Sequence, residues 1–281
     1  MKILLTGSKG FIGRNIVELL GDKHKIIEVT RGIKFDINNL NSLLDINDVD
    51  IVIHAAAKTF VPDSFIDPYN FYKFNINSSL NIAEYCRIKK IHKLIYLNTY
   101  LYGTPNYCPV DEGHRVSLHS PYNKSKYLSE KILINYLEDV TNVVSLRLFN
   151  IYGKHQKHDF LVPHIIKQAL EGDNVIVKDL EPKRDYLYIK DMVSLIDLII
   201  NSKSAYGVYN VGSGESYSVG QVIDLVVDIL NKPIKVKASG VRRESEVMDC
   251  YADIRKLVKD FDWIKKYSLR SGLADYIDEI K

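Results

Sequence analysis

Two residues that could transfer a proton, Tyr122 and Lys126, lie four positions apart in the segment "SPYNKSKYLSEKI". In a helix this spacing places both side chains on one face. A free phenol has a pKa of about 10, and a nearby ammonium favours the phenolate and lowers that pKa toward neutral pH. The pair is therefore a candidate acid–base unit, although an exposed tyrosine and a solvated lysine would give the same spacing.

A second polar pair, Asn98 and Thr99, ends the apolar run in "KLIYLNTYLYG". The run is typical of a buried strand, and ligands of α/β proteins bind at the carboxyl ends of strands. Asn98 and Thr99 therefore either take part in the chemistry or are simple polar residues at a strand end.

Three glycines in "TGSKGFIG" indicate a site for a dinucleotide. Gly7, Gly10 and Gly13 follow a strand and open a helix, which allows a tight turn, close approach to a pyrophosphate and close helix–strand packing. The helix N-terminus would face the phosphates, and we include Phe11 and Ile12 among the cofactor-contacting residues. The alternative is a glycine-rich turn without a ligand.

The residues after the second strand bear on the choice of cofactor. A carboxylate there hydrogen-bonds the ribose of NAD, whereas an arginine accommodates the 2′-phosphate of NADP. The chain has Thr30 and Arg31 in "EVTRG", which predicts NADP, with NAD possible if Arg31 is only a solvated loop charge. Asp36 and Ile37 could hold the adenine, although Asp36 could instead be a helix N-cap.

The elements around these residues predict an α/β fold. Apolar runs alternate with helical patterns through the first half of the chain, and continuous Val/Ile/Leu strands between helices indicate a parallel sheet covered on both faces. We expect a Rossmann-type doubly wound parallel sheet. The expected strands span 2–6, 25–30, 50–56, 93–98 and 143–150, and the expected helices span 11–20, 38–44, 70–88 and 122–137.

The regular alternation of apolar strands and helical patterns ends after Tyr152. We expect one helix and one strand in 153–177 and a return to the sheet in 184–212. In the tail we expect a helix, a strand at 234–238 and short helices around Trp263 and Leu273. The predicted domains are a dinucleotide-binding domain, 1–153 with 184–212, and a smaller α/β substrate lobe, 154–183 with 213–281. The crevice between them is the expected site.

Composition excludes several classes of function. The net charge is +3 and there is no long basic run, which argues against a nucleic-acid partner. The apolar runs are strand-sized, so no membrane span is expected, and "MKILLTG" begins a strand rather than a signal peptide. Three separated cysteines, Cys86, Cys108 and Cys250, predict neither a disulfide framework nor a metal site and are typical of a reducing cytoplasm.

Taken in order, these motifs resemble those of extended short-chain dehydrogenases/reductases, and more narrowly the NAD(P)-dependent epimerase/dehydratase family that acts on nucleotide sugars. The resemblance covers nearly the whole chain. It rests on "TGSKGFIG", "IHAAA", "YLNTYLYG", the Tyr122–Lys126 pair, "RLFNIYG", "KRDYLYIKD" and "NVGSGESYS".

The resemblance implies a role for each matching position. Tyr122 would be the acid–base at the sugar oxygen, and Lys126 would bind the nicotinamide ribose and tune Tyr122. The implied cofactor contacts are Gly7, Gly10, Gly13, Asp36, Ile37, Ala55, Ala56, Ala57, Asn75, Tyr122, Lys126 and Phe149. The implied substrate contacts are Asn98 or Thr99, Tyr122, Asn150 toward the phosphates, and Arg184 and Arg243 on the diphosphate. An arginine suits a phosphate because its guanidinium can bind in a bidentate manner, although Arg184 could instead pair with Asp185, and Arg243 with Glu244 or Glu246.

One position departs from the family pattern. The family usually has a serine or threonine at the tip of the fourth strand, where an ungapped alignment places Asn98. An amide can donate to an oxyanion but cannot relay a proton as a hydroxyl can, so we predict that the neighbouring Thr99 is the catalytic residue. The family's dehydratases follow the threonine with Asp and Glu, whereas Tyr100 and Leu101 follow here, which disfavours a dehydratase.

Three functions remain open from the sequence. The first is a 4-ketoreductase that transfers hydride from NADPH to a nucleoside-diphosphate sugar, which suits Thr30 and Arg31. The second is a 4-epimerase with tightly bound NAD, and the third is a non-catalytic nucleotide-binding or sensor protein. The helices expected at 70–88 and 122–137 have apolar positions on more than one face, and the resemblance implies that they pair between subunits of a homodimer. We also predict a cytoplasmic location and a role in polysaccharide biosynthesis.

Overall fold

The computed structural model describes residues 1–30, 35–241 and 246–281. These residues form two compact units. The first unit comprises 1–102, 115–148 and 196–209, and the second comprises 103–114, 149–195 and 210–281. The predicted division into a dinucleotide-binding domain and a substrate lobe stays a prediction. The two units differ from its bounds in residues 103–114, 149–153, 184–195 and 210–212.

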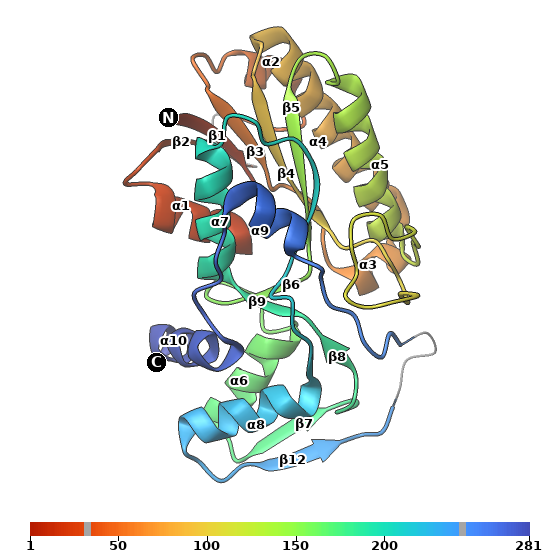
Figure 1. Cartoon of the computed structure of the whole chain (residues 1–281), viewed down its shortest axis with the longest axis vertical. Helices are drawn as coiled ribbons and strands as arrows, with labels where there is room; N and C mark the ends of the chain where they lie inside the picture. Colours follow the sequence, from red (N-terminus) through yellow and green to blue (C-terminus); the bar gives the residue numbers. More distant parts are fainter. Residues whose placement is uncertain (31–34, 242–245) are drawn as a thin grey trace. The chain divides into compact units, whose positions relative to one another are not determined.

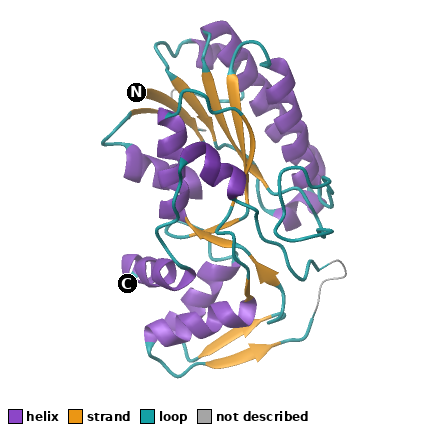
Figure 2. Ribbon diagram, in the orientation of Figure 1, coloured by secondary structure: helices purple, strands orange, loops and turns teal. Residues whose placement is uncertain are grey.

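A six-stranded sheet contains the strands of the first unit, in the order β10-β5-β4-β3-β1-β2 (Figure 2). Its strands are β1 (Lys2–Thr6), β2 (Lys25–Val29), β3 (Ile51–His54), β4 (Lys93–Thr99), β5 (Asn142–Leu148) and β10 (Gly207–Val211). β1 pairs in parallel with β2 and with β3, and parallel pairing continues from β3 to β4 and from β4 to β5. The mixed α/β fold with a large parallel sheet is therefore confirmed.

Helices cover both faces of this sheet, so that the fold is doubly wound. α4 and α5 lie side by side over one face, and α1 lies on the other with α7 (Figure 1). The helices concerned are α1 (Phe11–Leu20), α2 (Leu40–Leu44), α3 (Val61–Ile66), α4 (Pro68–Lys89), α5 (Pro121–Tyr136) and α7 (Ile189–Asn201). Asp67 and Ser120 cap α4 and α5, each accepting a backbone N–H three residues on, and a proline follows each cap at the first helical position, where it is best tolerated.

The centre of the sheet is apolar because its strands are buried on both faces. Every residue of β3 is buried, and so are six of the seven residues of β4, with the half-buried Thr99 as the exception. Leu4, Val52 and Leu94 from neighbouring strands pack with Ile82 and Leu133 from α4 and α5. This core fixes the strand ends where the polar residues of the site lie.

The described residues of the second unit form three two-stranded sheets, β11-β8, β12-β7 and β6-β9. Its strands are β6 (Asn150–Tyr152), β7 (Asn174–Val177), β8 (Lys183–Arg184), β9 (Tyr186–Tyr188), β11 (Tyr217–Ser218) and β12 (Lys235–Ala238). Its helices are α6 (Leu161–Glu171), α8 (Val219–Leu230), α9 (Arg255–Phe261) and α10 (Leu269–Ile280). The expected return to the large sheet is correct for β10 but wrong for β9, which pairs with β6 instead.

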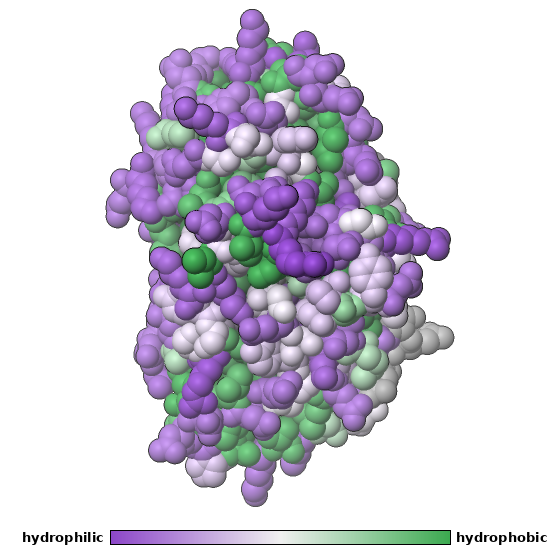
Figure 3. Space-filling model, viewed as in Figure 1, coloured by the Kyte–Doolittle hydropathy of each residue, from purple (hydrophilic) through white to green (hydrophobic). Residues whose placement is uncertain are grey.

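The surface drawn in Figure 3 is mainly hydrophilic, with smaller hydrophobic patches between the polar side chains. Within the described residues, no helix combines the length and the apolar character that crossing a membrane would require. The three cysteines are free thiols, and two of them, Cys86 and Cys250, are buried.

Candidate active site

The loop after β1 and the first turn of α1 contain two positions at which only glycine fits, because a Cβ atom would clash with the backbone. Gly7 has a φ of +72°, and a Cβ atom there would lie 2.8 Å from the Cα of Ala56. A Cβ on Gly13 would lie 2.2 Å from the carbonyl oxygen of Gly7. α1 begins directly after Gly10, which has no side chain to satisfy the first N–H groups of the helix. The loop and helix end therefore have the form of an anion-binding cradle that fits a pyrophosphate.

The tip of β3 is fixed against this loop by Thr6. The Thr6 hydroxyl oxygen accepts the backbone N–H groups of Ala55 and Ala56, each at 3.1 Å. It also lies 2.8 Å from Nδ1 of the buried His54. Burial lowers the pKa of His54 to about 3, and the charge of Lys126 acts in the same direction. The imidazole is therefore neutral. Because the Thr6 oxygen already accepts two N–H groups, its own proton is the one available for a bond to Nδ1.

Asn75 joins the segment after β3 to the start of α5. Its side-chain oxygen accepts the N–H of Lys58 at 2.8 Å, and its amide nitrogen donates to the Lys58 carbonyl at 3.2 Å and to the Ser125 hydroxyl at 2.9 Å. Asn75 is 2% exposed, and both N–H donors of its amide are used in these bonds. The predicted contact of Asn75 with the cofactor ribose stays a prediction.

Tyr122 lies in the first turn of α5 and is half-buried. Its ring meets the edge of Phe71 with the centroids 6.5 Å apart. Burial raises the pKa of Tyr122 to about 12, and a side-chain hydrogen bond with Thr99 opposes that rise. The expectation that the pKa would lie below its ordinary value is therefore wrong for this structure, because burial outweighs the favourable contacts.

Lys126 lies one turn further along α5 and is 2% exposed. Its Nζ donates to the carbonyl oxygen of Leu97 at 2.8 Å and lies 4.1 Å from the centroid of the Tyr96 ring. Burial lowers the pKa of Lys126 to about 7, while the negative charge of Glu130 acts in the opposite direction. The proton on this lysine is thus held loosely enough to be exchanged near neutral pH.

The two residues at the tip of β4 have different surroundings. Asn98 is 3% exposed, and its amide nitrogen donates to Oε2 of Glu130 at 2.7 Å. Its side-chain oxygen accepts the backbone N–H of Thr99 at 2.9 Å. Thr99 is half-buried, and its side chain acts on Tyr122, whose pKa it lowers. The structure thus brings Thr99, Tyr122 and Lys126 together and directs the Asn98 amide toward Glu130.

The buried ion pair behind this trio was missed from the sequence. Glu130 is fully buried, and Arg147 on β5 donates to Oε1 from Nη2 at 2.7 Å and to Oε2 from Nε at 3.2 Å. Ser145 also donates to Oε2 at 2.7 Å, and Arg147 donates to the Tyr102 hydroxyl at 3.0 Å. An arginine inside the apolar strand "VVSLRLFN" was the available signal, because a charge there requires a partner.

The predicted adenine residues have structural contacts of their own. Asp36 accepts the backbone N–H and the side-chain amide of Asn38 at 3.0 and 3.1 Å, so it forms an Asx turn. The N-cap of α2 is Asn39 and not Asp36. Ile37 is 2% exposed and packs in the core. Thr30 directly follows Val29, whose carbonyl accepts the Gly7 N–H at 3.0 Å, and Arg31 lies outside the described residues.

The other predicted substrate residues lie in the second unit. Asn150 donates to the Asp185 carbonyl at 3.0 Å, and Phe149 is buried. Arg184 donates to Glu246 at 2.5 Å, to the Lys183 carbonyl at 2.7 Å and also to the Val247 carbonyl. Asp185 is therefore not its partner. Arg243 lies outside the described residues.

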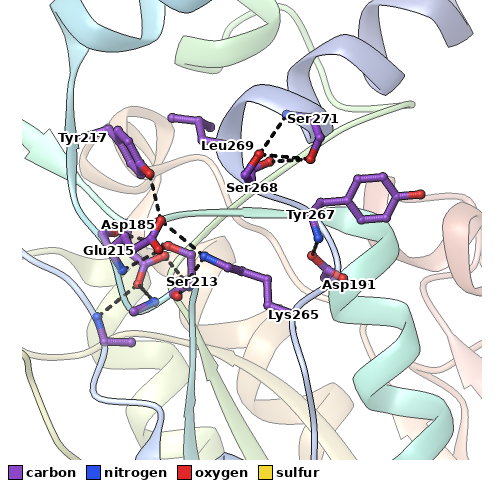
Figure 4. Close-up of polar contacts among 12 residues, drawn as sticks. Asp185, Asp191, Ser213, Glu215, Tyr217, Lys265, Tyr267, Ser268, Leu269 and Ser271 are labelled. Atoms are coloured by element: carbon purple, nitrogen blue, oxygen red, sulfur yellow. Dashed lines mark hydrogen bonds and ion pairs between the residues drawn. The ribbon is translucent and has the colours of Figure 1, made fainter.

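Asp185 instead organises the loop after β10. It accepts the backbone N–H groups of Ser213, Gly214 and Ala252 at 2.6, 3.1 and 3.1 Å. Figure 4 shows Lys265 directed toward the same loop, where it contacts the Ser213 carbonyl and the Glu215 carboxylate. Asp185 and Lys265 thus fix the loop, and Asp185 immediately follows the predicted phosphate-binding Arg184.

Comparison with known proteins matches residues 3–212 to the NAD dependent epimerase/dehydratase family. The UDP-glucose 4-epimerase of Bacillus subtilis is 25% identical, over 98% of this chain and 95% of the relative. The GDP-6-deoxy-D-mannose reductase of Pseudomonas aeruginosa is 25% identical, over 100% of this chain and 98% of the relative.

Among solved structures, the UDP-glucose 4-epimerase of Thermotoga maritima with UDP-glucose superimposes with a TM-score of 0.90. It is 27% identical, and the match covers 100% of this chain and 98% of that one. The match to the family model extends from the glycine loop through the Thr99–Tyr122–Lys126 trio to the end of β10. The chain therefore belongs to the NAD-dependent epimerase/dehydratase family.

Proposed function

We propose that this chain reduces the C4 keto group of a nucleoside-diphosphate sugar with a hydride from NADPH. The observation that carries the proposal is the trio itself, in which Lys126 lies one turn after Tyr122 on α5 and donates to the Leu97 carbonyl, two residues before Thr99 on β4. The family consists of NAD(P)-dependent enzymes, and its members here include a reductase of a GDP-sugar. A non-catalytic role is not proposed, because the trio is intact.

The nicotinamide would supply the hydride when bound. Tyr122 would donate its phenolic proton to the oxygen that becomes an alkoxide, which is the role of a general acid. Its raised pKa keeps the phenol protonated at neutral pH. Thr99 would stabilise the same oxygen through its hydroxyl, and Lys126 would hold positive charge beside the site. Arg184 and Arg243 would bind the diphosphate.

The preference for NADPH rests on the end of β2. Thr30 directly follows β2, whose last carbonyl contacts the glycine loop. Because threonine has no carboxylate, it would not repel a 2′-phosphate at this position. A cofactor titration tests this proposal. We expect the purified protein to consume NADPH faster than NADH when given 4-keto sugars linked to UDP, GDP, CDP or dTDP. No consumption of either cofactor with any of them would contradict the proposal.

A 4-epimerase is the second candidate, and the epimerases among its relatives favour it. An epimerase oxidises C4 and then returns the hydride to the other face, so its cofactor shows no net turnover. Interconversion of two nucleotide sugars without consumption of NADPH would replace the reductase proposal with this one. The homodimer, the cytoplasmic location and a role in polysaccharide biosynthesis stay predictions from the sequence.

Two variants test whether Thr99 or Asn98 stabilises the sugar oxygen that accepts the proton. We expect Thr99→Val to lower kcat about 100-fold, since loss of one donor to a developing oxyanion has an effect of this order. Asn98→Ala should stay within about tenfold of the wild type, because its amide is bonded to Glu130 and not to Tyr122. Steady-state kinetics of both variants checks this, and the reverse ranking would assign the role to Asn98.

A further inference from the structure

The carboxylate of Glu130 is buried next to the catalytic trio, too deep to touch a substrate: it accepts from Asn98, which precedes Thr99, and it follows Lys126 by one turn of α5. It lies on α5 at positions four after Lys126 and eight after Tyr122, and it is fully buried. This spacing places the three side chains on one face of the helix. The face turns toward β4 and β5, where Leu97, Asn98, Ser145 and Arg147 contact it.

The first connection runs through Asn98. Oε2 of Glu130 accepts the Asn98 amide at 2.7 Å, and the Asn98 side-chain oxygen accepts the backbone N–H of Thr99 at 2.9 Å. Since a carboxylate only accepts, the Asn98 nitrogen must face Glu130 and its oxygen must face Thr99. The amide is thereby oriented, and it fixes the peptide that carries the Thr99 side chain.

The second connection is electrostatic. Lys126 is buried against an aromatic ring and a carbonyl, and Glu130, one turn further along the same face of α5, is the negative charge that raises its pKa. The other titratable groups near Lys126 are His54 on β3, Tyr96 on β4 and Tyr122 on α5. His54 is neutral, and burial raises the pKa of Tyr96 and of Tyr122 above the ordinary value, so neither phenol contributes a negative charge near neutral pH.

Glu130 is itself held in the charged form. Burial raises its pKa, but the hydrogen bonds and positive charge of Arg147, with the bonds from Ser145 and Asn98, outweigh burial and lower it. The carboxylate thus stays negative throughout the range in which Lys126 exchanges its proton.

We propose that Glu130 is a positioning residue for the trio: its carboxylate orients Asn98, which fixes Thr99, and its charge keeps the proton on Lys126. The expected effect of Glu130 on turnover rests on the proposed function. It also explains the departure of Asn98 from the family pattern, because a serine at that position is shorter and could not both reach Glu130 and accept the Thr99 N–H.

The test measures the protonation of Lys126 directly. In the full chain labelled with ¹³C at lysine Cε, the Lys126 signal is assigned by its loss in Lys126→Met, and its titration midpoint is followed by NMR. We expect Glu130→Gln to lower the midpoint by at least one pH unit, a tenfold loss of proton affinity. Arg147→Gln is the matched control, because it breaks the same ion pair but removes a positive charge, so the midpoint should not fall.

If Glu130→Gln does not fold, the comparison of Arg147→Gln with the double variant Glu130→Gln/Arg147→Gln isolates the same charge without leaving an unpaired ion. The double variant should show the lower midpoint. Asn98→Ala should leave the midpoint unchanged and lower kcat about threefold to tenfold. An unchanged midpoint without Glu130, or an equal fall in Arg147→Gln, would overturn the proposal. The NMR result is obtained without substrate, so it stands even if no 4-keto sugar is reduced.

Discussion

Tyr122→Phe should lower kcat by about 100-fold to 10,000-fold, the range expected for loss of a general acid. Phenylalanine keeps the ring that meets Phe71 and removes only the hydroxyl that is bonded with Thr99. The KM values for cofactor and sugar should change little, because the lost interaction acts on the transition state. Steady-state kinetics with NADPH and the 4-keto sugar that the wild type reduces best gives both constants.

Tyr127→Phe is the matched control for this variant. Tyr127 is the next tyrosine on α5, and its ring faces Lys131 with the Nζ 5.4 Å from the centroid. Removing its hydroxyl should leave kcat within about twofold. If Tyr122→Phe stayed within tenfold of the wild type, Tyr122 would not be the proton donor, and the proposed chemistry would need another acid.

The raised pKa of Tyr122 also bears on the direction of the reaction. A phenol with a pKa of about 12 is protonated at neutral pH, which is the form that reduction of a ketone requires. Oxidation of an alcohol needs the phenolate instead. In the protein without ligands, Tyr122 is therefore prepared to donate a proton, which agrees with the reductase proposal.

The parts of the site that follow from local rules were predictable from the sequence. The glycine spacing required a strand, a tight turn and a helix, and the structure places Gly7 and Gly13 where a Cβ would clash with backbone. The Tyr122–Lys126 spacing gave the shared helix face for the same reason. Strands β1, β4 and β5 were recognisable because strands buried on both faces are continuously apolar.

Other features depended on contacts between distant segments. The sign of the Tyr122 pKa shift is set by burial, which the "YNKSK" segment alone does not reveal. β9 has the apolar character of a strand in the large sheet, yet it pairs with β6, and strand patterning does not specify a partner. Glu130 and Arg147 are 17 residues apart on different elements, so only the pairing of β5 beneath α5 shows that they meet.

Arg147→Met should lower the free energy of unfolding by about 3–5 kcal/mol, the effect of removing one partner from a buried ion pair. The Glu130 carboxylate would remain fully buried with only the Asn98 and Ser145 hydrogen bonds. Urea denaturation of the wild type and the variant at neutral pH gives the difference. Arg87→Met is the control: this arginine forms a comparable 2.7 Å pair with Glu84, but at the surface, so the unfolding free energy should hardly change.

The double variant Arg147→Met/Glu130→Leu separates the cost of an unpaired charge from the value of the pair. Two apolar side chains of similar size leave no buried ion, so most of the lost stability should return. Turnover should not return with it, because Asn98 would lose its acceptor and Lys126 the facing carboxylate. A double variant as unstable as Arg147→Met would instead show that packing around the aliphatic part of the arginine side chain, and not the unpaired Glu130 carboxylate, sets the stability of this region.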